Sequence, residues 1–211
     1  MRPPDSWSTA RVTLILTLVT AAAWLIVALL GADNWAAFEG GFIPDRIGGH
    51  STGAIPVWLT PLTATLVHAN FAHIALNLLI LVFCGRPTEN VLGPVNLVIL
   101  YLVGAYAAAG AHWLMQPDSP VPMIGASGAI SAVLGAYSIR FGRNRVRVAN
   151  PTLARWINAL WLMAAWVGLQ IVVGITFASA GIGVAIAAHI GGFAIGLLLA
   201  NPLLLFRYRR A

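Results

Sequence analysis

The chain has 211 residues, of which 59% are hydrophobic and only 9% charged, and its mean hydropathy is +0.85. An ordinary water-soluble domain has about a quarter of its residues charged, so this composition excludes that class and indicates a protein whose solvent is lipid. The single cysteine, Cys84, excludes an intramolecular disulfide, and the net charge of +6 has to be interpreted by position.

Six long apolar runs follow one another along the chain. They cover about 12–31, 66–84, 95–115, 126–142, 153–177 and 182–206. A helix needs roughly 20 apolar residues to cross the hydrocarbon layer, and a backbone in lipid must satisfy its own hydrogen bonds. We therefore expect an all-α polytopic membrane protein with a bundle of six transmembrane helices. The first run exceeds the core of a signal peptide in length, so we expect it to be a retained span.

The connections between the runs hold the turn-forming and charged residues, for example Cys-Gly-Arg-Pro at 84–87. The longest connection, about 32–65, contains Trp35, Phe38, Phe42 and Trp58 among glycines and prolines. This aromatic content predicts an element that lies at the outer membrane interface.

The basic residues are all arginines, and their positions predict the topology. With a cytoplasmic N-terminus, only Arg46 falls on the outer side, as the positive-inside rule requires. The segment from Arg140 to Arg155 is then a topology determinant, and we expect no nucleic acid partner. The expected organisation is a short cytoplasmic N-terminus at 1–10, one membrane domain at 11–206 and a basic cytoplasmic tail at 207–211. The expected cytoplasmic arginines are Arg2, Arg11, Arg86, Arg140, Arg143, Arg145, Arg147, Arg155, Arg207, Arg209 and Arg210.

Polar side chains inside apolar runs are costly in lipid, and those that persist usually face the bundle interior and often mark function. His73 and Asn77 are four residues apart, so they share one helix face, with His68 just above them. We interpret His112 and Gln170, which stand apart, as an interfacial and a packing residue. The remaining polar residues of the runs are Ser127 and Ser131 in the fourth and His189 in the sixth.

Ser127 and His189 form the candidate reactive pair. Ser127 lies at the expected opening of the fourth helix, where unpaired amides and the helix dipole can stabilise an oxyanion. His189 lies early in the sixth helix, which runs in the same direction, so the two residues are expected at similar depth. A histidine within reach of a serine can accept its proton and deliver it to a leaving amine. Because no Asp or Glu lies in a run near them, the pattern predicts a dyad.

Small residues at four-residue spacing would let the two helices approach closely. They are Gly128, Ala132 and Ala136 on the fourth helix and Gly192 and Gly196 on the sixth. Each feature has a structural interpretation by itself, since a serine at a helix start is most often an N-cap and small-residue faces usually serve packing alone. Taken together, the features favour a catalytic site.

Metal binding by His68, His73 and His189 is an alternative for the buried histidines. No carboxylate or thiolate lies at ligand spacing, so we expect no metal site.

Three segments occur in the order and spacing that rhomboid intramembrane serine proteases use. They are His68 to Asn77 (HANFAHIALN), Gly125 to Gly128 (GASG) and Ala188 to Gly196 (AHIGGFAIG). The chain resembles the six-span bacterial form of this family. The likeness extends through Gly85-Arg86, Glu89 and Gly93 and covers nearly the whole chain.

The resemblance implies that Ser127 is the nucleophile and His189 its base. It implies that His73, Asn77 and the backbone amide of Ser127 form the oxyanion hole, with His68 nearby. The substrates would be transmembrane segments of other membrane proteins, and no cofactor is implied. The first connection, the loop between the third and fourth helices and a mobile fifth helix would control substrate entry. The residues expected to support the site are Gly125, Gly128, Gly192 and Gly196.

The chain departs from this family pattern at two positions. Ser131 stands where many relatives have an aromatic residue that packs on the catalytic histidine, and Trp58 is followed by Leu59 where relatives often have arginine. Neither change removes a group that performs the chemistry.

The leading hypothesis is a serine endopeptidase that cuts near the outer face of a bacterial cell membrane. A catalytically silent rhomboid-like binding protein is the first alternative, and the intact pair of Ser127 and His189 argues against it. A small transporter or channel is the second. It would need a polar path toward the cytoplasm, whereas the inner halves of the runs are almost wholly apolar.

Overall fold

The structure is a computed structural model that describes residues 10–141, 150–176 and 186–209. Most of the expected N-terminus and part of the basic segment and tail lie outside these ranges, including Arg2, Arg143, Arg145, Arg147 and Arg210.

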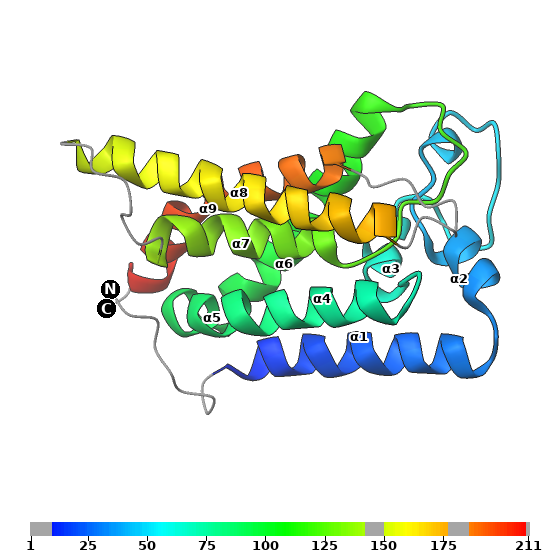
Figure 1. Ribbon diagram of the computed structural model, residues 1–211, viewed down its shortest axis with the longest axis horizontal. Coiled ribbons are helices and arrows are strands. Elements are labelled where there is room, and N and C mark those ends of the chain that lie inside the picture. Colours follow the sequence, from blue (N-terminus) through cyan, green and yellow to red (C-terminus); the bar gives the residue numbers. More distant parts are fainter. Residues whose placement is uncertain (1–9, 142–149, 177–185, 210–211) are drawn as a thin grey trace.

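The regular elements of the described residues are helices, which confirms the expected all-α class (Figure 1). The long helices are α1 (Arg11–Leu29), α4 (Phe71–Ile80), α6 (Pro94–Met115), α7 (Ser127–Phe141), α8 (Pro151–Thr176) and α9 (Ile186–Tyr208). The short elements are α2 (Asp33–Gly40), η1 (Pro44–Arg46), α3 (Thr60–Thr63), η2 (Ala64–Leu66), η3 (Leu81–Gly85) and α5 (Arg86–Leu92).

Four helical stretches of the described chain are long and apolar enough to cross a membrane. They are Arg11–Leu29, Phe71–Leu92, Pro94–Met115 and Ile186–Tyr208. The expected fourth and fifth runs form α7 and α8, and the described part of α7 has 15 residues. At 1.5 Å per residue this described part is shorter than the roughly 30 Å hydrocarbon layer. The six-span count therefore stays a prediction.

The second span differs from its prediction at both ends. We expected it at 66–84 with a connection at 84–87, but the helix begins at Phe71 and continues to Leu92. One π turn, η3, precedes Pro87, which occupies the first turn of α5, where a proline ring is tolerated. The chain turns instead at Gly93, whose φ of +86° favours glycine.

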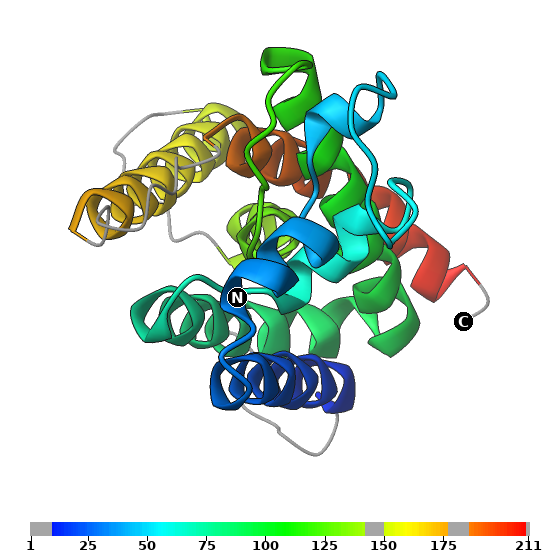
Figure 2. The same cartoon turned by 90° about the vertical axis from the view of Figure 1, so that its right-hand side faces the viewer.

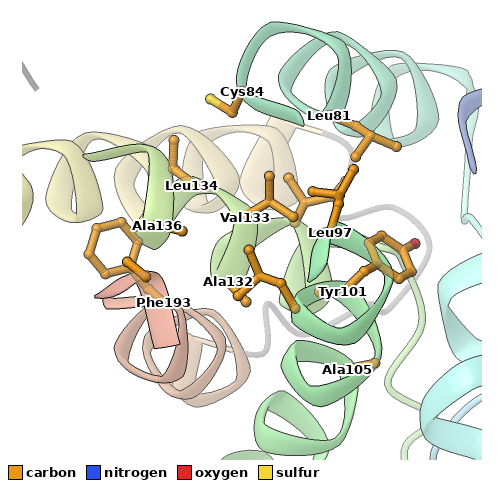
Figure 3. Close-up of a cluster of buried hydrophobic side chains, with 14 of the residues drawn as sticks. Leu81, Cys84, Leu97, Tyr101, Ala105, Ala132, Val133, Leu134, Ala136 and Phe193 are labelled. Atoms are coloured by element: carbon orange, nitrogen blue, oxygen red, sulfur yellow. The ribbon is translucent and has the colours of Figure 1, made fainter. Parts of the chain in front are cut away.

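Helix α7 lies in the middle of the bundle, as the view in Figure 2 shows. Nearly all of its residues are buried, which is the pattern of a helix surrounded by others. Its neighbours are mainly α9 and α6, with α8 on another side. The residues that surround it in Figure 3 include Leu81 and Cys84 of η3, Leu97, Tyr101 and Ala105 of α6, and Phe193 of α9.

The long first connection lies over the end of the bundle that is opposite to the start of α1 (Figure 1). Phe42 and Met123 exchange two backbone hydrogen bonds of 2.9 and 2.8 Å, which join this connection to the segment before α7. The Tyr106 hydroxyl donates to the carbonyl of Trp58 over 2.9 Å, so α6 holds the connection at this point. The next residue is Leu59, where arginine was expected from the resemblance. Trp35 and Trp58 are 66% and 64% exposed. Such side chains fit the expected interfacial location.

The start of α1 and the end of α9 lie at the same end of the bundle, on the left of Figure 1. Glu89 ties α1 to α5 there, because its buried carboxylate accepts hydrogen bonds from the backbone amides of Val12 and Thr13 and from the Thr13 hydroxyl, over 2.7 to 2.9 Å. A carboxylate that accepts from the first amides of a helix is favoured by the helix dipole. Glu89 is thus structural and lies at the opposite end from α2 and α3.

Candidate active site

The start of α4 places His73 and Asn77 on one face of the helix. The Asn70 side chain caps α4 by accepting the backbone N–H of His73 over 2.9 Å. Asn77 is fully buried, and its amide nitrogen donates to the carbonyl of His73 over 2.8 Å. The spacing expected from the sequence therefore holds.

His68 lies in the connection before α4 and not on the helix, because the helix begins only at Phe71. It is nevertheless beside the other histidine, with 5.0 Å between the ring centroids of His68 and His73. Its Nε2 accepts the backbone N–H of Ala126 at 3.4 Å. His68 thus contacts the segment that leads into Ser127.

The turn before α7 brings His73 to Ser127. Gly125 has a φ of +109°, and a Cβ placed on it would lie 2.7 Å from the imidazole ring of His73 and 3.8 Å from Ser127 Oγ. Only glycine allows both this conformation and this close approach. The Gly125 amide donates to the carbonyl of Ala64 over 2.9 Å, which holds the turn in place. The imidazole of His73 consequently packs directly on the turn that carries Ser127.

Ser127 and His189 are in direct contact. The distance from His189 Nε2 to Ser127 Oγ is 2.8 Å, although the residues are 62 positions apart in the sequence. Both side chains are buried, with 7% and 3% of their surfaces exposed. The contact joins the first turns of α7 and α9, and Ser127 lies at the helix start, where amides have no acceptor within the helix.

The contact depends on how closely α7 and α9 approach. A Cβ on Gly192 would run into the carbonyl oxygen of Gly128, and one on Gly196 into the carbonyl oxygen of Ala132. The backbones therefore touch along this line, and any side chain would separate the helices.

The second ring nitrogen of His189, Nδ1, is buried. No residue within 10–141, 150–176 and 186–209 forms a hydrogen bond with it. The buried carboxylate of Glu89 binds the start of α1. Among the described residues, no carboxylate bonds to the far side of the imidazole.

Trp166 of α8 also contacts this pair, which the sequence did not indicate. Its ring lies 6.2 Å from the His189 ring, centroid to centroid, with 67° between the planes. Its indole nitrogen donates to Ser131 Oγ over 2.8 Å, and the Ser131 hydroxyl donates to the carbonyl of Ser127 over 2.6 Å. The apolar run in the sequence predicts the presence of α8. It does not predict which tryptophan of α8 points into the bundle.

A cavity of about 60 Å³ lies beside Ser127 and is lined by His73, His189, Gly125 and Gln170 among others. This volume accommodates water-sized groups. Gln170 is 5% exposed, which agrees with the packing residue expected from the sequence, and among the described residues its amide nitrogen has no hydrogen-bond partner. Asn77 is not among the lining residues and lies behind His73.

A larger hollow of about 870 Å³ lies between the C-terminal end of α6, the segment 119–123 and the start of α9. His112 lines it and is buried within the protein, and its expected position at the membrane interface stays a prediction. Neither Ser127 nor His189 is among its lining residues, although the hollow and the smaller cavity share Pro122 and Met123.

Known proteins resemble the chain over most of its length. A family profile described as the rhomboid domain matches residues 56–206. Rhomboid protease GlpG of Pectobacterium atrosepticum is 27% identical over 192 residues, which cover 89% of this chain and 61% of the relative. Rhomboid protease AarA of Providencia stuartii is 29% identical over 168 residues, which cover 72% and 58%.

An animal relative shows the same likeness. Rhomboid-related protein 2 of Mus musculus is 31% identical over 131 residues, which cover 61% of this chain and 43% of the relative. The chain thus spans less than two-thirds of the length of these curated relatives. Since the family profile covers well over half of the chain, this multi-pass helical membrane protein belongs to the rhomboid family.

Proposed function

We propose that the protein is an intramembrane serine endopeptidase that uses Ser127 and His189 as a catalytic dyad. The observation that carries this proposal is the 2.8 Å contact between His189 Nε2 and Ser127 Oγ in a buried site. Two relatives are named rhomboid proteases, which supports the same reaction class. The proposed substrates are transmembrane segments of other proteins in the same bilayer.

In the proposed reaction, Ser127 Oγ attacks the scissile carbonyl carbon while His189 Nε2 accepts the hydroxyl proton. The tetrahedral intermediate collapses as the imidazolium gives that proton to the leaving amine, and an ester to Ser127 remains. Water then attacks the ester, with His189 again accepting and returning one proton. The reaction consumes one water and needs no cofactor.

The oxyanion that forms in both steps needs donors placed in advance. We propose that these are the His73 imidazole, the Asn77 amide and the backbone N–H of Ser127. His73 lines the cavity beside Ser127, and Asn77 has a second amide hydrogen besides the one it donates to the His73 carbonyl. Gln170 can donate from the opposite helix to a bound peptide.

We also propose that the dyad lies near the outer face of the cell membrane, with both termini in the cytoplasm. Arg11, Arg86 and Arg207 lie at the start of α1, the start of α5 and the end of α9. These helix ends share one end of the bundle, opposite to the starts of α7 and α9 (Figure 1). Such a distribution supports the orientation that the positive-inside rule predicts.

The decisive test is covalent labelling of purified protein in detergent or proteoliposomes with a fluorophosphonate, together with cleavage of a model transmembrane substrate. We expect labelling at Ser127, which mass spectrometry would locate. Ser127→Ala should remove labelling and cleavage, and His189→Ala should lower both by at least about a hundredfold, because a general base contributes that much.

Ser138→Ala is the matched control, since Ser138 is also a buried serine of α7 but bonds only to the carbonyl of Gly135. It should label and cleave like the unmodified protein. A folded protein that neither labels nor cleaves would instead be a silent rhomboid-like binding protein, and cleavage that persists in Ser127→Ala would exclude the dyad.

A further inference from the structure

In the described part of the chain, no hydrogen bond on the far side of the His189 imidazole fixes its orientation. In most catalytic histidines a partner on the second nitrogen fixes the ring's tautomer and rotation. Here Nδ1 is buried, no described residue bonds to it, and His189 is 3% exposed. The angle of the ring must therefore be set by the groups that pack on it.

Trp166 is the aromatic group that packs on this ring. The indole meets the imidazole edge to face, with 6.2 Å between centroids, which is within the range of favourable aromatic pairs. Trp166 is 3% exposed, whereas Trp161 and Trp156 on the same helix are 69% and 44% exposed. Only the inward-facing tryptophan of these three is placed to hold the histidine.

The indole is itself fixed in position through Ser131. Its N–H donates to Ser131 Oγ over 2.8 Å, and that hydroxyl donates to the backbone carbonyl of Ser127 over 2.6 Å. His189 closes the circuit through its 2.8 Å contact with Ser127 Oγ. The four residues Trp166, Ser131, Ser127 and His189 thus form a closed ring of contacts that joins α8, α7 and α9.

We propose that Trp166, held by the Ser131 hydroxyl, is a positioning residue that orients the imidazole of His189 toward Ser127. The inference rests on the proposed function, because it assigns a role in the same reaction. A small hydroxyl residue at position 131 is what leaves room for the indole and gives its N–H an acceptor. The orientation of the base thereby depends on α8, a helix that carries neither member of the dyad.

The test compares four variants of the full-length protein. Trp166→Ala removes the ring, Trp166→Phe keeps a ring but removes the N–H, and Ser131→Ala removes the acceptor. The double variant Trp166→Ala with Ser131→Phe returns a ring from α7 into the space that the indole vacates. Trp161→Ala is the matched control, since it removes an indole of the same helix that faces outward.

The first readout is whether the loss of cleavage activity lies in kcat or in KM for a model transmembrane substrate. We expect Trp166→Ala to lower kcat by about tenfold to a hundredfold with KM nearly unchanged, since misplacing a catalytic group has effects of this size. Trp166→Phe and Ser131→Ala should each lose about threefold to tenfold, and the double variant should recover part of the loss. Trp161→Ala should match the unmodified protein.

The second readout does not depend on activity. The chain has five histidines, so carbon-13 histidine labelling gives few ring signals, and His189→Gln identifies the one from His189. The ring current of the aromatic side chain at position 166 should shift this signal in the unmodified protein and, less strongly, in Trp166→Phe, and the shift should disappear in Trp166→Ala. A role in folding alone would not produce this graded pattern.

Unchanged kcat in Trp166→Ala would overturn the proposal, as would lost activity with an unmoved His189 signal. If Trp166→Ala does not fold, Trp166→Phe and Ser131→Ala decide the question by the same two readouts. If the unmodified protein is folded but neither labels nor cleaves, the proposed function fails. The ring-current comparison then still shows whether Trp166 sets the position of His189.

Discussion

Helix α7 packs against α9 on one side and α8 on another, and the two contacts are built differently. Toward α9 the contact is backbone against backbone, with Gly192 and Gly196 lying on carbonyl groups of α7. Toward α8 it includes an indole that reaches across to Ser131. Both sides meet at Ser127 and His189, where α9 brings His189 to Ser127 and Trp166 of α8 packs on the His189 ring.

The difference shows how a membrane protein can fix one distance and still adjust an orientation. A contact without side chains leaves almost no freedom, because any added atom collides with the neighbouring backbone. A contact made by a side chain can change with its rotamer or with a small shift of the helix. The distance from Ser127 to His189 should therefore respond to changes in α9, and the ring angle of His189 to changes in α8.

The largest expected effect is a loss of stability from a substitution in the contact between α7 and α9. Gly196→Ala would place a methyl group against the carbonyl of Ala132, and the backbone there has no room to yield. We expect the free energy of unfolding to fall by about 3 kcal/mol, at the upper end of overpacking costs. Unfolding in mixed micelles with increasing denaturing detergent would measure this.

Gly110→Ala is the matched control for Gly196→Ala. Gly110 also lies within a helix, α6, but a Cβ there would have no heavy atom within 4 Å. It should therefore leave stability unchanged or slightly raised. If Gly196→Ala lowers the free energy of unfolding by less than about 0.5 kcal/mol, the contact between α7 and α9 relaxes more easily than an overpacked protein interior does.

The next prediction compares the loss of catalytic rate in two substitutions within the same contact between α7 and α9. Gly192→Ala collides with the carbonyl of Gly128, next to Ser127, whereas Gly196→Ala acts one turn deeper. We expect Gly192→Ala to lower kcat by about a hundredfold, because a displacement near 1 Å has that effect on a positioned pair. Cleavage assays at a temperature where both variants remain folded would show the difference, and equal losses in the two would contradict it.

The sequence predicted the helices well because lipid imposes a simple rule on composition. Runs of apolar residues had to become helices, and those described did. It misplaced the ends of the second span, since Gly85-Arg86-Pro87 has the composition of a turn. One π turn accommodates this proline within a continuing helix, which single-residue signals do not reveal.

The site was predictable where spacing within one helix determines geometry. His73 and Asn77 share a face because they are four apart, and glycines at four-residue spacing lie along α9. Trp166 was not predictable, because α8 has apolar residues on every side and its rotation is set by tertiary contacts. Gln170 was expected to be a packing residue and is buried, but its place beside Ser127 was missed for the same reason.

The smallest expected effect is on the α8 side, away from the dyad. A Cβ on Gly168 would have no heavy atom within 4 Å, so Gly168→Ala adds helix preference without a collision. We expect unfolding free energy to rise by about 0.5 to 1 kcal/mol, with kcat unchanged. Ala165→Gly, at an exposed position of the same helix, should lower it by a similar amount. A marked loss in Gly168→Ala would show that this face of α8 packs as tightly as α9 does, and α8 would then be no more adjustable than the glycine contact.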